Sequence, residues 1–91
     1  SDLASETLTM SVFPNPLSTA AQIEVFNPES QPLFLDIVNL NGEIVKRIDL
    51  GFQQQGFINQ ELNLSELAMG TYFTIIRGSQ SHFVEKIIIQ K

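Results

Sequence analysis

The sequence predicts an all-β fold, an antiparallel β-sandwich of seven short strands, and three observations support this prediction. In several segments apolar and polar residues alternate with the period of two that half-buried strands require. Turn-forming residues interrupt these segments at fairly even intervals. Helical periodicity is almost absent: only the segment 65–70, with Ser65 as a cap and Gly70 as a stop, could form a helical turn.

The apolar positions mark the expected strands. The segment 20–26 alternates Ile23 and Val25 with polar residues, which is typical of a strand with one buried face. The segment 32–39 is apolar on both faces except at Asp36, which favours a central strand. The full set of expected strands is 8–13, 20–26, 32–39, 43–50, 56–64, 71–78 and 82–90.

Glycine, proline and asparagine define the connections. The pair Asn41-Gly42 predicts a type I′ hairpin turn, since both central residues of that turn need a positive φ. A proline-bounded loop at 27–32 and a polar turn at 78–81 separate other strands. Pro14 and Pro16 predict a stiff, extended corner before the second strand.

The stretch LAMGTY at 67–72 predicts that the sandwich is immunoglobulin-like. In such sandwiches a tyrosine near the start of a late strand donates a hydrogen bond to the backbone of the preceding corner. Leu67 is expected to pack under the turn, Gly70 to adopt an unusual backbone angle and Tyr72, the only tyrosine, to supply the hydroxyl. The alternative is a buried aromatic residue that makes no such bond.

Size and charge limit the class of protein. The 91 residues suffice for one small domain. Five Lys and Arg against ten Asp and Glu give a net charge of −5, which disfavours nucleic acid and anionic membrane surfaces as partners. There is no cysteine for a disulfide or a thiolate zinc site, and no apolar run reaches the ~20 residues of a membrane-spanning helix.

Candidate catalytic and metal-binding residues are few. His82 is the only histidine, and because it follows a polar turn we expect an exposed side chain without a catalytic role. Asn39, Asn41 and Glu43 lack the spacing of a calcium-binding loop. The domain is therefore predicted to be no enzyme and to hold no metal or cofactor.

Carbohydrate binding is an alternative function, because sugars stack on exposed aromatic side chains and small β-sandwiches often bind them. The chain has no tryptophan, and most of its seven phenylalanines are expected in the core. Phe52 and Phe57, which flank the QQQG loop, are the two candidates for exposure, and we interpret them as loop anchors. An accessory fibronectin- or immunoglobulin-like module of a secreted hydrolase, and a purely structural or dimerising domain, stay as alternatives.

Four short motifs occur in order along the chain. The first is FPNP, and the second is an Asn, a Gly and a Val spaced three residues apart. The third is L-x-x-G-x-Y, and the fourth is a lysine followed by an apolar final strand. In this order they resemble the C-terminal sorting domain of type IX secretion cargo (type A, the Por secretion system C-terminal domain) of Bacteroidota-type bacteria, over residues 11–91. The matching positions are Phe13, Pro14, Asn15, Pro16, Asn39, Gly42, Val45, Leu67, Gly70, Tyr72, Lys86, Ile87, Ile88 and Ile89.

Two positions depart mildly from the family pattern. Phe13 stands where the family often has tyrosine, and Asn39 stands where it often has aspartate. Both keep the physical role, which is an apolar ring before the proline corner and a side chain able to bond its own turn.

The resemblance implies a sorting label at the C-terminus of a larger exported protein. The cargo would reach the periplasm by a signal peptide, and the type IX translocon at the outer membrane would then recognise the domain. A sortase-type surface peptidase usually removes such a domain, and the cargo is attached to lipopolysaccharide or released at the cell surface. Residues 10–91 are then the sorting domain, and residues 1–9 are a linker from an upstream cargo domain. The cleaved bond is expected in this linker.

The last strand is expected to carry most of the recognition, because a strand near the chain end offers a backbone edge to which a receptor can add. Lys86 is either a contact for the receptor or a charged residue that protects the aggregation-prone stretch FVEKIII. Pro14 and Pro16 are expected to act mainly through the fold.

Overall fold

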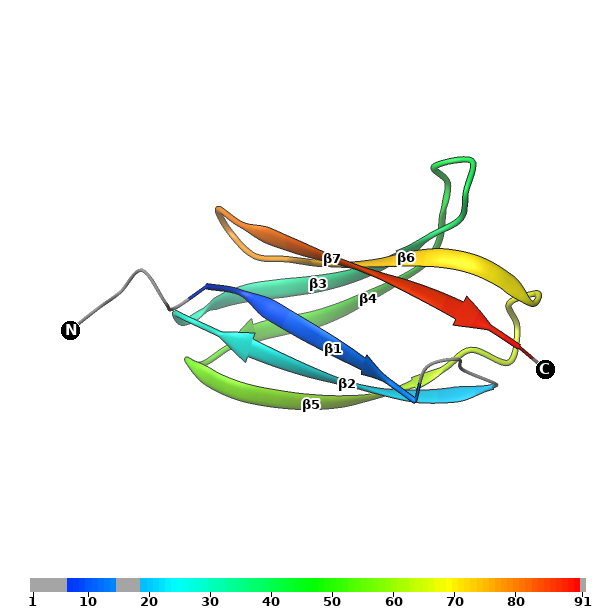
Figure 1. Cartoon of the computed structure of the whole chain (residues 1–91). Coiled ribbons are helices and arrows are strands. Elements are labelled where there is room, and N and C mark those ends of the chain that lie inside the picture. The colour runs from blue at the N-terminus through cyan, green and yellow to red at the C-terminus, as the bar shows by residue number, and fades with distance from the viewer. Residues whose placement is uncertain (1–6, 15–18, 91) are drawn as a thin grey trace.

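The computed structural model describes residues 7–14 and 19–90, and it contains seven strands in two sheets packed face to face (Figure 1). One sheet has the strand order β1-β2-β5 and the other β4-β3-β6-β7, with every neighbouring pair antiparallel. The predicted seven-stranded immunoglobulin-like sandwich is confirmed, and each strand lies close to its expected position. The strands are β1 Thr9–Phe13, β2 Ala20–Asn27, β3 Gln31–Val38, β4 Ile44–Gln53, β5 Gly56–Asn63, β6 Gly70–Arg77 and β7 His82–Ile89.

Aliphatic side chains from the inner faces of both sheets form the core. Ile23 and Val25 of β2 are fully buried, as the alternation in this segment predicts. β3 is a central strand of its sheet, which confirms the interpretation of its apolar sequence, and it buries Leu33, Leu35 and Ile37. Burial of these branched side chains supplies the main favourable term in folding.

The seven phenylalanines lie where the sequence analysis did not expect them. None belongs to the fully buried core, and only Phe83 packs against it. The expectation that most would be internal was wrong, because the strand alternation gives the inner positions to aliphatic residues. The outward-facing phenylalanines are Phe13, Phe26 and Phe57 on the β1-β2-β5 sheet, and Phe34, Phe52 and Phe73 on the other sheet.

The β3–β4 hairpin turn differs from the predicted type I′ turn. Gly42 has a φ of 86°, but no non-glycine residue in the described ranges has a positive φ, so Asn41 does not adopt the conformation that a type I′ turn requires. The backbone N–H of Gly42 donates to the carbonyl oxygen of Asn39 at 3.0 Å, which places the turn one residue earlier. A single glycine with positive φ after such a turn is typical of a three-residue hairpin loop closed by a bulge.

The corner between β5 and β6 contains the predicted tyrosine bond. The hydroxyl of Tyr72 donates to the carbonyl oxygen of Ala68 at 2.6 Å. Leu67 is buried beneath the corner, and Gly70 has a φ of 150°, which few residues other than glycine adopt. The tyrosine corner is therefore confirmed.

The segment before this corner forms a single turn and no helix. The backbone N–H of Leu67 donates to the carbonyl oxygen of Leu64 at 3.0 Å, and the side-chain oxygen of Asn63 accepts from the backbone N–H of Ser65 at 3.0 Å. Asn63 thus bonds the start of the turn, a role that the sequence analysis gave to Ser65. Within the described ranges no helix is long and apolar enough to cross a membrane.

Buried amide side chains join three connections at one end of the sandwich. The Asn27 amide donates to the carbonyl oxygens of Gln53 at 3.2 Å and Gln54 at 3.0 Å, in the β4–β5 hairpin. Gln31 donates to the side-chain oxygen of Asn27 at 2.8 Å and accepts from the backbone N–H of Ser79 at 2.8 Å, in the β6–β7 turn. These bonds satisfy polar groups that would otherwise make burial costly.

Candidate recognition surface

The outer face of the β1-β2-β5 sheet is polar and acidic. Its cross-strand rows are Phe13, Gln22 and Glu61; Ser11, Glu24 and Asn59; and Thr9, Phe26 and Phe57. Glu24 and Glu61 are the only charged residues in these rows. Phe26 and Phe57 form the main apolar feature, with ring centroids 5.2 Å apart.

The outer face of the β4-β3-β6-β7 sheet, which we call the four-stranded face, is largely apolar with basic groups among the apolar residues. Its cross-strand rows are Ile44, Val38, Phe73 and Lys86; Arg47, Asp36, Ile75 and Val84; and Asp49, Phe34, Arg77 and His82. Three Lys or Arg residues against two carboxylates give these rows a net positive charge, although the whole chain has a charge of −5. The two outer faces of the sandwich therefore differ in sign as well as in polarity.

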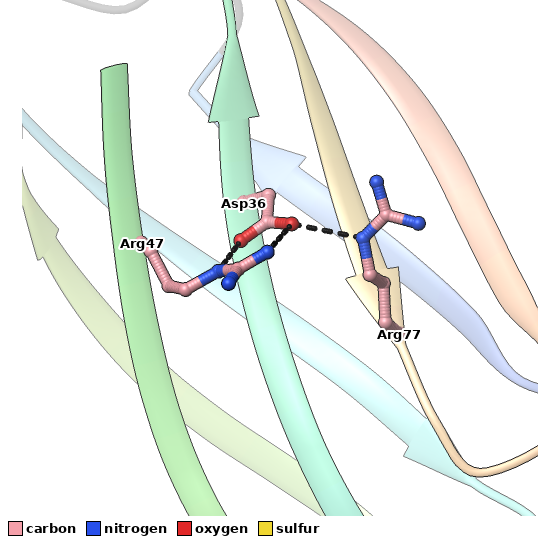
Figure 2. A network of polar contacts seen from close by, with 3 residues as sticks. All are labelled: Asp36, Arg47 and Arg77. Carbon is pink, nitrogen blue, oxygen red and sulfur yellow. Dashed lines mark hydrogen bonds and ion pairs between the residues drawn. The ribbon is translucent and has the colours of Figure 1, made fainter. Parts of the chain in front are cut away.

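An ion cluster lies at the centre of the four-stranded face, where Asp36 of β3 is flanked by Arg47 of β4 and Arg77 of β6 (Figure 2). Arg47 donates through Nε to Oδ1 at 2.6 Å and through Nη2 to Oδ2 at 2.9 Å. Arg77 donates through Nε to Oδ2 at 2.8 Å. The hydrogen bond from Arg47, assisted by that from Arg77, holds the pKa of Asp36 below its ordinary value, although burial opposes this shift. Asp36 is therefore a buried and charged carboxylate.

Arg77 retains unused hydrogen-bonding capacity. Its bond to Asp36 uses Nε, and Figure 2 shows both terminal nitrogens directed away from the carboxylate. No residue in the described ranges accepts a hydrogen bond from those terminal nitrogens. The Arg77 side chain is 43% exposed, so this edge of the guanidinium is accessible to a partner.

The residues of the four sequence motifs divide into a scaffold group and a surface group. Leu67, Tyr72, Ile87 and Ile89 are buried. Val45, Lys86 and Ile88 are exposed, and all three belong to the four-stranded face: Val45 precedes Arg47 by two positions on β4, and the other two lie on the outward side of β7.

Asn39 and Gly42 shape the β3–β4 hairpin. The side-chain oxygen of Asn39 accepts from the backbone N–H groups of Asn41 at 2.9 Å and Glu43 at 3.0 Å, so the expected bonding of Asn39 to its own turn is confirmed. Because this oxygen is used by the turn, the geometry gives no support to a calcium-binding loop at these residues.

The FPNP motif lies at the end of β1. Phe13 and Pro14 are exposed, and the peptide bond between them is cis. Asn15 and Pro16 lie outside the described residues, so their expected roles stay predictions.

Other candidates from the sequence lie apart from one another. His82 is exposed at the first position of β7, as expected. Phe52 and Phe57 are 67% and 71% exposed, but they lie within β4 and β5 on opposite faces of the sandwich. They are therefore not loop anchors, and they do not form one aromatic platform for a sugar. The described part of the chain also holds no group of three His, Cys, Asp or Glu residues placed to bind a metal ion.

The Asp36 cluster was not predicted from the sequence. One signal was available, since a lone charged residue in an apolar central strand must be paired if it is buried. The partners could not be assigned from sequence, because Arg47 and Arg77 reach Asp36 only through the registers of β3 with β4 and with β6.

The fold and this surface define a small all-β domain with one sheet face suited to binding another molecule. The family model of the secretion system C-terminal sorting domain matches residues 11–90. The chain belongs to this family, whose members are the C-terminal sorting signals of type IX secretion. A comparison with curated proteins gave no match.

Membership confirms the resemblance that the four motifs indicated, and it does not favour an accessory module of a hydrolase. A type IX sorting signal implies a translocon that reads it and a cargo protein linked to it. It also implies a secreted protein that reaches the cell surface or the exterior.

Proposed function

We propose that residues 10–91 are a non-catalytic address domain and that residues 1–9 link it to an upstream cargo domain. The cargo reaches the periplasm first, and the outer-membrane translocon then recognises the folded domain. A sortase-type surface peptidase cuts within residues 1–9 and separates the domain from its cargo. The family match over residues 11–90 is the observation that supports this function most strongly.

The division of the motif residues supports a separation of roles. Leu67, Tyr72 and the inward-facing residues of β7 stabilise the fold, whereas Val45, Lys86 and Ile88 are available to a receptor. β7 is an edge strand that pairs only with β6 among the described strands. β1 of the other sheet lies beside it, and the outward side chains of β7 belong to the four-stranded face. We infer that the translocon contacts β7 together with the adjoining four-stranded face.

A reporter export assay tests the function. A fluorescent protein with a signal peptide at its N-terminus and residues 1–91 at its C-terminus is expressed in a bacterium with a type IX system and in a strain without the translocon. A matched control carries residues 1–9 only. Surface delivery is expected only for the complete fusion in the strain with the translocon, and periplasmic retention there would contradict the proposal.

The same fusion tests the cleavage step. N-terminal sequencing of the separated domain should give a first residue within or directly after residues 1–9. In a strain without the surface peptidase, the domain should stay attached to the reporter. Cleavage after Met10, in the remainder of β1 or in a later strand, would refute the assignment of the linker, and unchanged cleavage without the peptidase would refute the assignment of the enzyme.

A further inference from the structure

The position and the hydrogen bonds of Arg77 suit it to bind a carboxylate from another protein. It is held in place by its Nε bond to Asp36 at 2.8 Å, and its terminal nitrogens face away from that bond (Figure 2). The free edge of a guanidinium presents two parallel N–H donors that match the two oxygens of a carboxylate. An anchored side chain also loses less conformational freedom on binding than a mobile one.

The charge balance of the cluster favours an incoming anion. Asp36 supplies one negative charge for two guanidinium groups, so the cluster carries a formal charge of +1. Arg47 makes a bidentate pair with Asp36, and the excess charge is therefore best placed at Arg77. Arg77 has two apolar neighbours, Phe34 opposite it on β3 and Ile75 two positions away on β6. When a partner covers them, the local dielectric constant falls, and the attraction between Arg77 and a carboxylate becomes stronger.

The surroundings indicate a protein partner with apolar residues beside its carboxylate. Phe34 and Val84 are exposed next to the cluster, and sheet faces with contiguous exposed apolar side chains mark interaction sites. The exposed motif residues Val45, Lys86 and Ile88 continue the same face toward its other end. A partner that covers the motif residues would therefore also reach Arg77.

We propose that the four-stranded face docks a segment of the export machinery in which an Asp or Glu is flanked by apolar residues, and that Arg77 binds its carboxylate. This inference rests on the proposed sorting function and names the chemistry of the receptor contact. The acidic outer face of the β1-β2-β5 sheet has no corresponding site, because its rows contain Glu24 and Glu61 and no cation.

A substitution at the exposed residue Val84 tests the proposal with little effect on the stability of the domain. Val84 and Asp36 both stand opposite Ile75, on either side of β6, so an aspartate at position 84 would be a diagonal neighbour of Arg77 on the side away from Asp36. Val84→Asp would give Arg77 an internal carboxylate and would block the incoming one. Because Val84 is 47% exposed, the substitution removes little core packing, and Val84→Asn is its uncharged control.

The variants are compared in the export fusion, with urea unfolding of each purified domain as the measure of folding. Val84→Asp and Arg77→Gln should each lower surface delivery by about tenfold or more, the loss expected for a charge-assisted hydrogen bond. Val84→Asn, which loses the same apolar contact without adding a charge, sets the reference level for Val84→Asp. Lys46→Gln removes one positive charge beside Glu66, away from the four-stranded face, and should export normally. If Val84→Asp folds and exports as well as Val84→Asn, the proposal is overturned while the export of the unchanged fusion still supports the sorting function.

Photo-crosslinking identifies the partner chemistry. A benzoylphenylalanine at position 84 should crosslink, during export, to a peptide of the export machinery that contains Asp or Glu. Replacing that residue by Lys should restore the export of an Arg77→Glu fusion. A crosslink to a second copy of this domain, to lipid or to a segment without an acid would refute the inference, as would failure of the charge exchange in a folded Arg77→Glu domain.

Discussion

Replacement of Asp36 by Asn should destabilise the domain in a strongly pH-dependent manner. The substitution keeps the size of the side chain but removes the charge that three hydrogen bonds share, at 2.6, 2.9 and 2.8 Å. Asp36 is fully buried, but the two guanidinium side chains are 56% and 43% exposed, so solvent screens part of the attraction. Breaking a buried ion pair costs about 3–5 kcal/mol, and after this discount we expect about 2–3 kcal/mol for Asp36→Asn.

The pH dependence follows from the lowered pKa of Asp36. A carboxyl whose pKa is lower in the folded protein than in the unfolded chain stabilises the fold at pH values above its ordinary pKa of 3.8. This contribution is lost as the pH falls through the pKa of the folded state. The difference between the unchanged domain and Asp36→Asn should therefore be full at pH 6 and should shrink toward pH 2.

Urea unfolding monitored by circular dichroism at both pH values measures this difference. At pH 6 the melting temperature of Asp36→Asn should also fall by about 10 °C or more, given about 4–8 °C per kcal/mol for a domain of this size. A loss below about 0.5 kcal/mol at pH 6, or a loss that is equal at pH 6 and pH 2, would refute the reasoning from a buried, ionised carboxylate.

Two further substitutions test the scaffold by urea unfolding. Tyr72→Phe removes the bond to the Ala68 carbonyl oxygen and should cost about 1 kcal/mol, whereas an unchanged midpoint would mean that the tyrosine corner contributes only ring packing. Gly78→Ala would place a Cβ 2.5 Å from the buried Gln31 side-chain oxygen and should lower the free energy of unfolding by about 1–3 kcal/mol. An unchanged free energy of unfolding would show that the Gln31 side chain moves freely despite its bonds to Asn27 and Ser79.

Much of the fold was predictable because the strand signals are local. The alternation around Ile23 and Val25, and the apolar sequence of β3, follow from the period of the strand itself. The tyrosine corner was predictable because Leu67, Gly70 and Tyr72 lie within six residues of one another and form a known backbone pattern.

The incorrect predictions concern relations between strands or the exact place of a turn. Hydrophobicity alone placed phenylalanines such as Phe26 and Phe34 in the core, but the side of the sheet that a residue faces depends on the register of its strand. The Asn41-Gly42 pair marked the hairpin correctly, yet the bonds of Asn39 move the turn by one residue.

The candidate site was predictable only in part. The four motifs named Val45, Lys86 and Ile88 together with the buried Ile87 and Ile89, because a shared motif does not separate residues that stabilise the fold from residues on the surface. Arg77 was not predicted, since its relation to Asp36 joins residues that are 41 positions apart.

The central claim is that the receptor binds the four-stranded face and that the buried motif residues act through folding. A comparison of the export of the Lys86→Gln and Lys46→Gln fusions tests this claim most directly. Both substitutions remove one positive charge, but Lys86 is exposed on β7 and Lys46 bonds Glu66 at 2.8 Å in the β5–β6 connection. We expect both domains to unfold at unchanged urea concentrations and only Lys86→Gln to reduce surface delivery of the reporter. Equal export of the two fusions, whether normal or reduced, would contradict the claim.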